Sequence, residues 1–411
     1  MFLSKLRNKK EVISWSLYDF ANQPFTTIIV TFVYGAFFTS VIASDENTGT
    51  LLWTWGIAST AIIVSILSPI LGALADKGGY RKFFLILFTW ICAIFSILLY
   101  FPQSGDVFFA LSLFVIANIS FELGSVFCNS YLQDLSEDSN IGKISGFAWG
   151  LGFVGGLLAL FISFSLFELN SVGIRGINIL VGVWFLIFSI PTFLFVKDRK
   201  KDKLTKKHFV DSFVSIKTTF KEVVKYKIIM KFLIARLFFN DGLITIFALG
   251  GIYAVDTLDF TFDEVMMLGI ILNVSASIGS FIFGYLEDKI GVKRVINISL
   301  IVLVFSTLLA FIAPYFTFQK EIFWVAGVLI GLMVGPNQSC SRSLMAKLTP
   351  KEKQNEFFGF FALTGKATSF LGPILFGIIT FNFSQQVALW VVIFLFLIGL
   401  ILFNKINFQD E

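Results

Sequence analysis

Long apolar stretches recur along the whole chain and are separated by short polar segments. An α-helix needs about 20 apolar residues to cross a hydrocarbon core of about 30 Å, and twelve stretches reach that length. They cover residues 15–42, 51–74, 82–101, 106–131, 144–168, 174–196, 228–256, 263–286, 294–315, 321–345, 355–380 and 385–404. The stretches lack the alternation of apolar and polar residues that membrane-spanning barrel strands show. The pattern therefore predicts an all-α, polytopic membrane protein with twelve transmembrane helices.

Lysine and arginine residues lie mainly in every second connecting segment. Counted from the N-terminal segment, these alternate segments hold 27 of the 32 basic residues, whereas the other loops hold Arg175 and Lys320. Because the cytoplasmic loops of membrane proteins are rich in Lys and Arg, both termini are predicted to be cytoplasmic. Membrane topology thus explains the net charge of +5, and no nucleic-acid partner is expected.

The composition supports a membrane protein and argues against several classes of enzyme. Of the 411 residues, 56% are hydrophobic and 14% are charged, whereas a typical soluble domain has about 25% charged residues. The single histidine, His208, and three cysteines without CxxC spacing give no pattern for a zinc site, a disulfide framework or a serine–histidine relay. The phosphate-binding loop of ATPases is also missing from the sequence. We therefore expect no metal, no cofactor and no enzymatic activity.

The second half of the chain repeats features of the first half. The loop after the second span reads GALADKGGYRK over residues 72–82, and the loop after the eighth span reads GYLEDKIGVKR over residues 284–294, at an offset of 212. A pair of glycines six residues apart near the start of the fifth span recurs in the eleventh span at an offset of 213. The chain is therefore predicted to consist of two six-helix halves with pseudo-two-fold symmetry, residues 1–196 and 228–411.

The segment between the halves, residues 197–227, is strongly basic. Within it Phe209, Phe213 and Ile216 recur at helical spacing, and lysines occupy another face. This pattern predicts a cytoplasmic linker with an amphipathic helix on the inner leaflet of the membrane. A cytoplasmic extension of the seventh span is the alternative.

Several short motifs point to a known family. They are YDFAN at residues 18–22, NDG at 240–242, SRSL at 341–344 and FFGF at 357–360. Together with the repeated loop, they resemble the major facilitator superfamily, and within it unknown major facilitator family one, which includes the autophagy-linked vacuole effluxers of fungi. The resemblance implies transport of small solutes, with amino-acid efflux as the fungal precedent. It also implies that the first, fourth, seventh and tenth helices line a central cavity.

Apart from charged residues near the span ends, six ionisable residues fall within the predicted spans. They are Asp19, Glu122 and Asp241, which are acidic, and Arg236, Arg342 and Lys366, which are basic. A charge at the centre of a bilayer costs at least about 2.5 to 3.5 kcal/mol, so such residues usually pair or face a water-filled path. The set supports two interpretations: fixed structural pairs, or a site whose partners exchange between inward-open and outward-open states.

Helical spacing places polar residues on single faces of the four implied cavity helices. On the fourth span, Asn118, Glu122 and Ser125 share one face. The residues expected to handle substrate or protons are Asn22, Asn118, Glu122, Arg236, Asn240, Asp241, Asn337, Gln338 and Lys366. The residues expected to form a cytoplasmic gate are Asp19, Asp76, Arg81, Asp288, Arg294 and Arg342.

Two of these roles have structural alternatives. Glu122 could be a fixed partner of Arg236 or Lys366 rather than a substrate or proton ligand. Asp241 could cap a local break at Gly242 in its own helix.

These patterns predict a secondary active transporter that moves a small polar or zwitterionic solute, such as an amino acid, by alternating access. Coupling to protons is expected at Glu122 or Asp241. The predicted setting is the cytoplasmic (inner) membrane, with the protein acting as a monomer. The alternative is an exporter or flippase of lipids or hydrophobic drug-like molecules, which would need fewer buried charges.

Overall fold

The computed structural model describes residues 8–44, 46–167, 170–198 and 226–408. The described residues form helices and connecting turns, with no strand among them. Most of the predicted linker, including its amphipathic helix, lies outside the described residues.

Twelve helices or helix groups in the described part of the chain are long and apolar enough to cross a membrane. Their bounds match the predicted spans to within a few residues, so the all-α fold with twelve candidate transmembrane helices is confirmed. The first span combines α1 (Lys9–Pro24), α2 (Tyr34–Phe37) and two wider π-helical segments, Phe25–Phe32 and Phe38–Ile42. The π-helical geometry starts directly after Pro24, whose ring disrupts the hydrogen bonding of a regular α-helix.

By their internal contacts, the described residues fall into two compact units. Unit 1 contains residues 1–136, 151–214 and 350–362, and unit 2 contains residues 137–150, 215–349 and 363–411, each without its undescribed residues.

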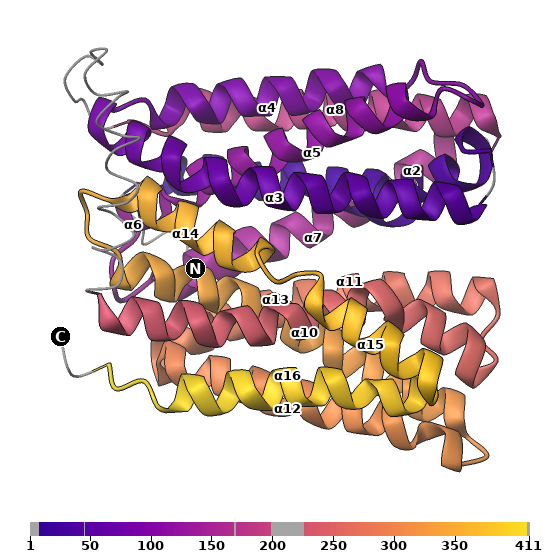
Figure 1. The fold of residues 1–411 in the computed structure, drawn as a ribbon. Coiled ribbons are helices and arrows are strands. Elements are labelled where there is room, and N and C mark those ends of the chain that lie inside the picture. The colour runs from indigo at the N-terminus through magenta and orange to yellow at the C-terminus, as the bar shows by residue number, and fades with distance from the viewer. Residues whose placement is uncertain (1–7, 45, 168–169, 199–225, 409–411) are drawn as a thin grey trace. The chain divides into compact units, whose positions relative to one another are not determined.

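Unit 1 contains most of the N-terminal half (Figure 1). After the first span come α3 (Glu46–Gly78), α4 (Arg81–Leu98), α5 (Val107–Asn129), α6 (Leu132–Leu135), the later part of α7 (Ile141–Leu166), α8 (Ser171–Phe195) and the start of α14 (Gln354–Lys366). Within this unit α4 packs against α5 and α8, and α1 packs against α8.

Unit 2 contains most of the C-terminal half. Its elements are the start of α7, α10 (Lys227–Leu258), α11 (Phe262–Ile290), α12 (Val292–Ile312), a short 3₁₀ turn (Ala313–Tyr315), α13 (Gln319–Leu348), the end of α14, α15 (Leu371–Asn382) and α16 (Gln385–Asn404). Here α13 packs against α11 and α12, while α16 packs against α10, α12 and α15.

Local sequence explains where several helices begin. The side chain of Asn170 accepts hydrogen bonds from the first free N–H groups of α8, and Ser384 does the same for α16. Thr261 and Glu264 form a reciprocal capping box at the start of α11. These caps satisfy N–H groups that would otherwise lack partners at the helix ends.

Two segments do not pack with their own half of the sequence: one from each half belongs to the unit formed mainly by the other half. Residues 350–362 follow the tenth span but pack in unit 1, and residues 137–150 follow the fourth span but pack in unit 2. Subtracting 213, the offset that relates the repeated glycines, from 350–362 gives 137–149, so the two exchanged segments are equivalent in the repeat. The boundaries predicted for the halves therefore describe the sequence repeat, and the contact units differ from them in these two segments.

Glycines allow close backbone contact in both exchanged segments. A Cβ at Gly359 would lie 2.6 Å from the carbonyl oxygen of Ser68 in α3, and a Cβ at Gly146 would lie 2.4 Å from the carbonyl oxygen of Ser280 in α11. Any larger residue would push the neighbouring helix away. The repeated glycines therefore serve helix packing in both units.

Candidate functional site

The acidic residue of the first repeated loop binds the start of α14 within unit 1. Asp76 accepts hydrogen bonds from the backbone N–H groups of Asn355 at 3.2 Å and Glu356 at 2.8 Å, and from the side-chain amide of Asn355 at 2.7 Å. A carboxylate is stabilised at a helix N-terminus because the free N–H groups there carry partial positive charge. We call this contact the unit 1 latch.

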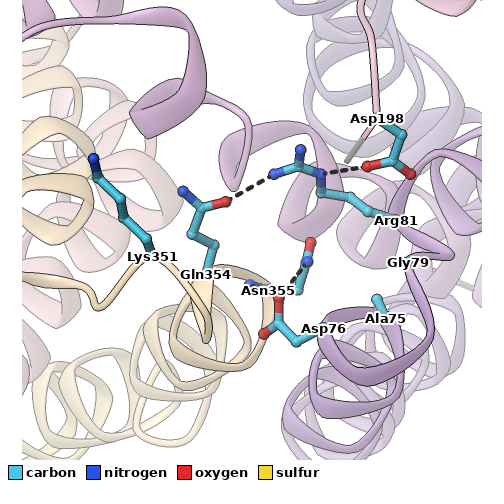
Figure 2. A pocket seen from close by; sticks show the side chains of 8 residues that line it. All are labelled: Ala75, Asp76, Gly79, Arg81, Asp198, Lys351, Gln354 and Asn355. Carbon is cyan, nitrogen blue, oxygen red and sulfur yellow. Dashed lines mark hydrogen bonds and ion pairs between the residues drawn. The ribbon is translucent and has the colours of Figure 1, made fainter. Parts of the chain in front are cut away.

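Arg81 connects the unit 1 latch to the surrounding loops (Figure 2). Its guanidinium donates to the side-chain oxygen of Gln354 at 3.0 Å and to the carboxylate of Asp134 at 2.7 Å. It also lies 3.4 Å from the carboxylate of Asp198 and stacks on the ring of Tyr131 at 3.5 Å. A planar guanidinium can make all of these contacts together because its N–H groups point in several fixed directions.

The unit 1 latch borders a small polar pocket of about 20 Å³. Figure 2 shows its lining, which consists of Ala75, Asp76, Gly79, Arg81, Asp198, Lys351, Gln354 and Asn355. Asp198 also accepts a hydrogen bond from the backbone N–H of Lys82, in the first turn of α4. The chain that leaves α8 is thus tied to the same arginine that contacts α14.

The second repeated loop forms the equivalent contact within unit 2. Asp288 accepts hydrogen bonds from the backbone N–H groups of Gly142 at 2.9 Å and Lys143 at 3.1 Å, in the first turn of α7. The ammonium group of Lys143 lies 3.3 Å from the same carboxylate. We call this contact the unit 2 latch.

Arg342 strengthens the unit 2 latch. Its guanidinium donates to the hydroxyl of Ser145 at 3.0 Å and to the carbonyl oxygen of Ser145 at 2.8 Å, and lies over the ring of Trp149 at 5.6 Å. Arg294 is exposed and makes no ion pair or hydrogen bond with another described residue, whereas Lys293 donates to the carbonyl oxygen of Ile406 at 2.7 Å. The contacts favour Lys293, and the gate role of Arg294 stays a prediction.

Glu287 is a buried residue of unit 2 that the sequence patterns did not indicate. It lies one residue before Asp288, where the first loop has Ala75. Its carboxylate accepts a hydrogen bond from the hydroxyl of Ser343 at 2.6 Å and lies 3.4 Å from the ammonium group of Lys347. The sequence signal that could have indicated Glu287 is its difference from the first repeat, which has Ala75 at the equivalent position.

The eleventh span consists of two helices rather than one. α14 ends at Lys366 and α15 begins at Leu371, and Figure 1 shows the chain leaving helical geometry between them. Pro373 has no N–H group to donate to the carbonyl of Ser369, and its ring crowds that carbonyl, so it favours a break here. The N–H of Leu371 instead donates to the carbonyl of Thr368 at 2.8 Å.

Three residues of α10 bind the two helix ends at this break. Asn240 donates to the carbonyl oxygen of Gly365 at 3.2 Å, and Arg236 donates to the hydroxyl of Thr364 at 3.5 Å. Asp241 accepts a hydrogen bond from the N–H of Gly372 at 3.0 Å. α10 is continuous through Gly242, so the alternative of a break there is wrong, and the break that Asp241 caps lies in the eleventh span.

The predicted substrate residues of unit 2 are largely brought together at this break. Gln338 of α13 donates to the side-chain oxygen of Asn240 at 3.1 Å, and Lys366 is the last residue of α14. Asn337 lies apart from this cluster because its amide donates to the hydroxyl of Ser299 in α12 at 3.0 Å. The cluster therefore contains Arg236, Asn240, Asp241 and Gln338, with Lys366 at the adjoining end of α14, and these residues lie in membrane-spanning segments.

The predicted site residues of unit 1 lie on α1 and α5. Asn22 and Asn118 are buried, while Asp19 and Glu122 are partly exposed. Because Glu122 and Arg236 belong to different units, their pairing stays a prediction.

The comparison with protein families identifies the family of the chain. The sequence model of the family described as "Vacuole effluxer Atg22 like" matches residues 45–410.

The chain belongs to the Atg22-like vacuole effluxer family.

Among relatives of this Atg22-like chain is the MFS-type transporter YxiO of Bacillus subtilis. It is 28% identical over 411 positions, which cover 96% of this chain and 94% of the relative. Autophagy-related protein 22 of Coccidioides immitis is 22% identical, over 84% of this chain and 70% of the relative.

Solved structures with the same fold are transporters of the major facilitator superfamily. The human organic anion transporter MFSD10 superposes with a TM-score of 0.75 at 13% identity, covering 97% of this chain and 99% of that one. The proton:xylose symporter XylE superposes with a TM-score of 0.73 at 15% identity, covering 97% of this chain and 95% of that one. The predicted superfamily is confirmed, and the Atg22-like chain is a multi-pass membrane transporter rather than an enzyme.

Proposed function

We propose that this Atg22-like transporter is a secondary active transporter that moves a small zwitterionic solute, such as an amino acid, by alternating access. The observation that carries the proposal is the cluster at the break in the eleventh span, where groups of both charge signs lie close together on α10. Arg236 faces the carbonyl end of α14, and Asp241 binds the N–H end of α15. A zwitterion offers the same two kinds of group, a carboxylate for the arginine and an ammonium for the aspartate.

The two latches support the transport mechanism. Each holds a helix of the opposite sequence half by its N-terminus, through Asp76 in unit 1 and Asp288 in unit 2. Alternating access requires contacts between the halves to form on one side of the membrane and to break during each cycle. Capping bonds to a helix N-terminus suit this role because they can form and break without repacking an apolar core.

The names of the relatives are consistent with small-solute transport. The family is described as vacuole effluxers, and the structural neighbours are an organic anion transporter and a xylose symporter. We propose that this chain works as a monomer in the cytoplasmic (inner) membrane with both termini in the cytoplasm. The concentration of basic residues in alternate loops supports this orientation.

We further propose that transport is coupled to protons through Glu122 or Asp241. Both are carboxylates within membrane-spanning segments, where a proton can neutralise the charge. Glu122 follows Phe121 in α5, and the ring of Phe121 stacks on Phe25, in the π-helical part of the first span, at 5.0 Å. The superfamily resemblance assigns both of these spans to the substrate cavity, which supports a role of Glu122 there.

Export of lipids or hydrophobic drug-like molecules is the second candidate. The observation that favours it is a small apolar cavity of about 40 Å³ within unit 2, between α10, α12, α13, α15 and α16. Phe323, Phe376 and Leu389 contribute to its lining. An apolar molecule would gain hydrophobic stabilisation there but would leave the charges of the cluster without partners.

A thermal-shift screen of the purified protein separates the two candidates. A ligand at about 100 times its Kd adds about 2.7 kcal/mol to stability and so raises the unfolding temperature. We expect stabilisation by one or more amino acids and little effect from phospholipids or hydrophobic drugs at matched concentrations. Stabilisation by the lipids or drugs alone would overturn the proposal and support the second candidate.

A further inference from the structure

The break in the eleventh span lies inside a membrane-spanning segment, where exposed backbone groups are costly. Residues 354–382 form one span by length and hydropathy, yet residues 367–370 are not helical. Each helix end at the break leaves N–H or C=O groups without partners in the helix. In a membrane these groups need partners from neighbouring helices.

The charges of α10 match the polarity of the two helix ends. A helix carries partial negative charge at its C-terminus and partial positive charge at its N-terminus. The cation Arg236 and the amide donor of Asn240 lie at the C-terminus of α14, whereas the carboxylate of Asp241 lies at the N-terminus of α15. This arrangement stabilises the break, so it is a built feature of the fold.

Asp241 uses only one of its two carboxylate oxygens in this contact. The side chain is 2% exposed, its Oδ2 accepts the hydrogen bond from Gly372, and its Oδ1 is buried without a hydrogen bond from any described residue. A bare carboxylate oxygen in such surroundings is costly unless it binds a cation. One oxygen suffices to bind a proton, whereas Ca²⁺ or Mg²⁺ needs about six oxygen ligands.

Few other charges lie on the elements that surround Asp241. α15 and α16, which pack against α10 here, contain no charged residue. On α10 itself the nearest cation is Arg236, and on α14 it is Lys366, next to the carbonyl that Asn240 binds. On α13, Arg342 is held by Ser145, and on α11 the acids Glu287 and Asp288 are held in the unit 2 latch.

α15 has little else to hold it in place. Of its twelve residues only Gly372 and Phe376 are buried. Phe376 lines the small apolar cavity of about 40 Å³, with Gly250 of α10 also in the lining. Densely packed cores resist movement, whereas a cavity of this size leaves the ring of Phe376 room for a small displacement. The N-terminal contact with Asp241 is therefore the main polar restraint on the helix.

We propose that Asp241 is a proton-binding site that controls the docking of α15 onto α10. A proton from the aqueous phase forms an O–H bond with Oδ1, and the carboxylate becomes a neutral carboxylic acid. The attraction between the carboxylate and the N-terminus of α15 is then lost, and the hydrogen bond from Gly372 weakens. α15 moves toward the cavity while α10 and α16 keep their packing. The proposal rests on the proton coupling proposed above and assigns that coupling to Asp241 and α15, which leaves Glu122 the role of a substrate ligand.

The test measures the position of α15 without substrate and without transport. Nitroxide labels are attached to the full-length protein at Phe370→Cys, beside the break, and at Lys405→Cys, after the end of α16. The protein without these two substitutions controls for labelling of the three native cysteines, which are buried. Distances between the labels are measured in lipid nanodiscs from about pH 8 to about pH 5, a range that spans the titration of carboxyl groups with altered environments.

We expect one main distance near pH 8 and a second distance whose population grows about fivefold or more near pH 5. Asp241→Asn, which is uncharged at every pH, should show the second distance throughout the range. The matched control Asp256→Asn lies on the same helix but binds the side chain of Gln385, and it should behave like the parent protein.

A distance distribution in the parent protein that does not change with pH would overturn the proposal, and this measurement needs no variant at Asp241. A pH response that persists in Asp241→Asn would also overturn it. Because no substrate is present, the outcome is independent of the proposed solute. A moving α15 in a protein that does not transport amino acids would contradict the proposed function but not the proton site.

Discussion

Substitution of Asp76 by asparagine tests the unit 1 latch most directly. The carboxylate accepts three hydrogen bonds, two of them from backbone N–H groups at the start of α14. In Asp76→Asn one oxygen is replaced by an NH₂ group, which cannot accept a hydrogen bond from an N–H donor. The variant therefore loses at least one bond and the favourable interaction of a negative charge with the helix N-terminus.

The expected loss follows from these contacts. A hydrogen bond to a charged group contributes about 1.5 to 3 kcal/mol, and an anion at a helix N-terminus contributes about 0.3 to 2 kcal/mol. Asp76 is mostly buried, so solvent weakens these terms only in part. We expect the docking of residues 350–362 in unit 1 to be weakened by about 2 to 4 kcal/mol.

Hydrogen–deuterium exchange reports this change at the latch itself. The N–H groups of Asn355 and Glu356 bond to Asp76, so their exchange requires the latch to open. A loss of about 2 to 4 kcal/mol corresponds to exchange about 30- to 900-fold faster at these two positions. The matched control Asp106→Asn alters a loop cap of the same unit, where the carboxylate accepts from the N–H of Gln103 at 2.9 Å. Unchanged exchange in Asp76→Asn, or equal acceleration in the control, would refute the assigned role of Asp76.

Two further predictions concern glycines of the eleventh span. Gly372→Ala should separate α15 from α10 and lower the unfolding temperature, because its Cβ would lie 2.1 Å from the hydroxyl oxygen of Thr245. Adding Thr245→Ala should restore much of the lost stability, so equal unfolding temperatures in the single and double variants would contradict this contact. Gly359→Ala should destabilise the protein because its Cβ would meet the backbone of α3, whereas Gly377→Ala, with open space around its Cβ, should stabilise it by about 0.5 to 1 kcal/mol. A thermal melt in which Gly377→Ala unfolds at a lower temperature than Gly359→Ala would contradict this packing.

Much of the fold was predictable because the membrane limits the structures that can cross it. Apolar length alone predicted the twelve spans, whereas the orientation indicated by the alternate basic loops stays a prediction. The repeated loop also indicated the residues of both latches, since an acid in the same place of each half suggests a shared role. Asp76 and Asp288 do bind equivalent helix starts.

The partners of these acids were less accessible from the sequence. Asp76 and Asn355 are 279 residues apart, and no local pattern connects them. The exchange of residues 350–362 and 137–150 between the contact units depends on tertiary packing, which apolar length does not encode. For the same reason the motif position pointed to Arg294, although Lys293 makes the hydrogen bond, which is partly buried, to the carbonyl oxygen of Ile406.

The break in the eleventh span shows a similar limit. The sequence contains its cause, Gly372 followed by Pro373, but the span is apolar enough to be taken as one helix. Asp241 was expected either to bind a ligand or to cap a break next to it in α10. Its actual partner lies 131 residues away. A helix break in a membrane protein is stabilised by neighbouring helices, so its capping residue has to be found in three dimensions.

Solute uptake into proteoliposomes with an inward proton gradient tests whether this protein transports amino acids. We expect saturable, gradient-dependent uptake of an amino acid by the parent protein, loss of that uptake in Glu122→Gln, and near-normal uptake in the control Glu137→Gln, which alters an exposed loop residue. Uptake in Glu122→Gln equal to that of the parent would remove Glu122 from the mechanism. Uptake of every tested amino acid equal to that of protein-free liposomes would contradict the proposed transport of small zwitterionic solutes.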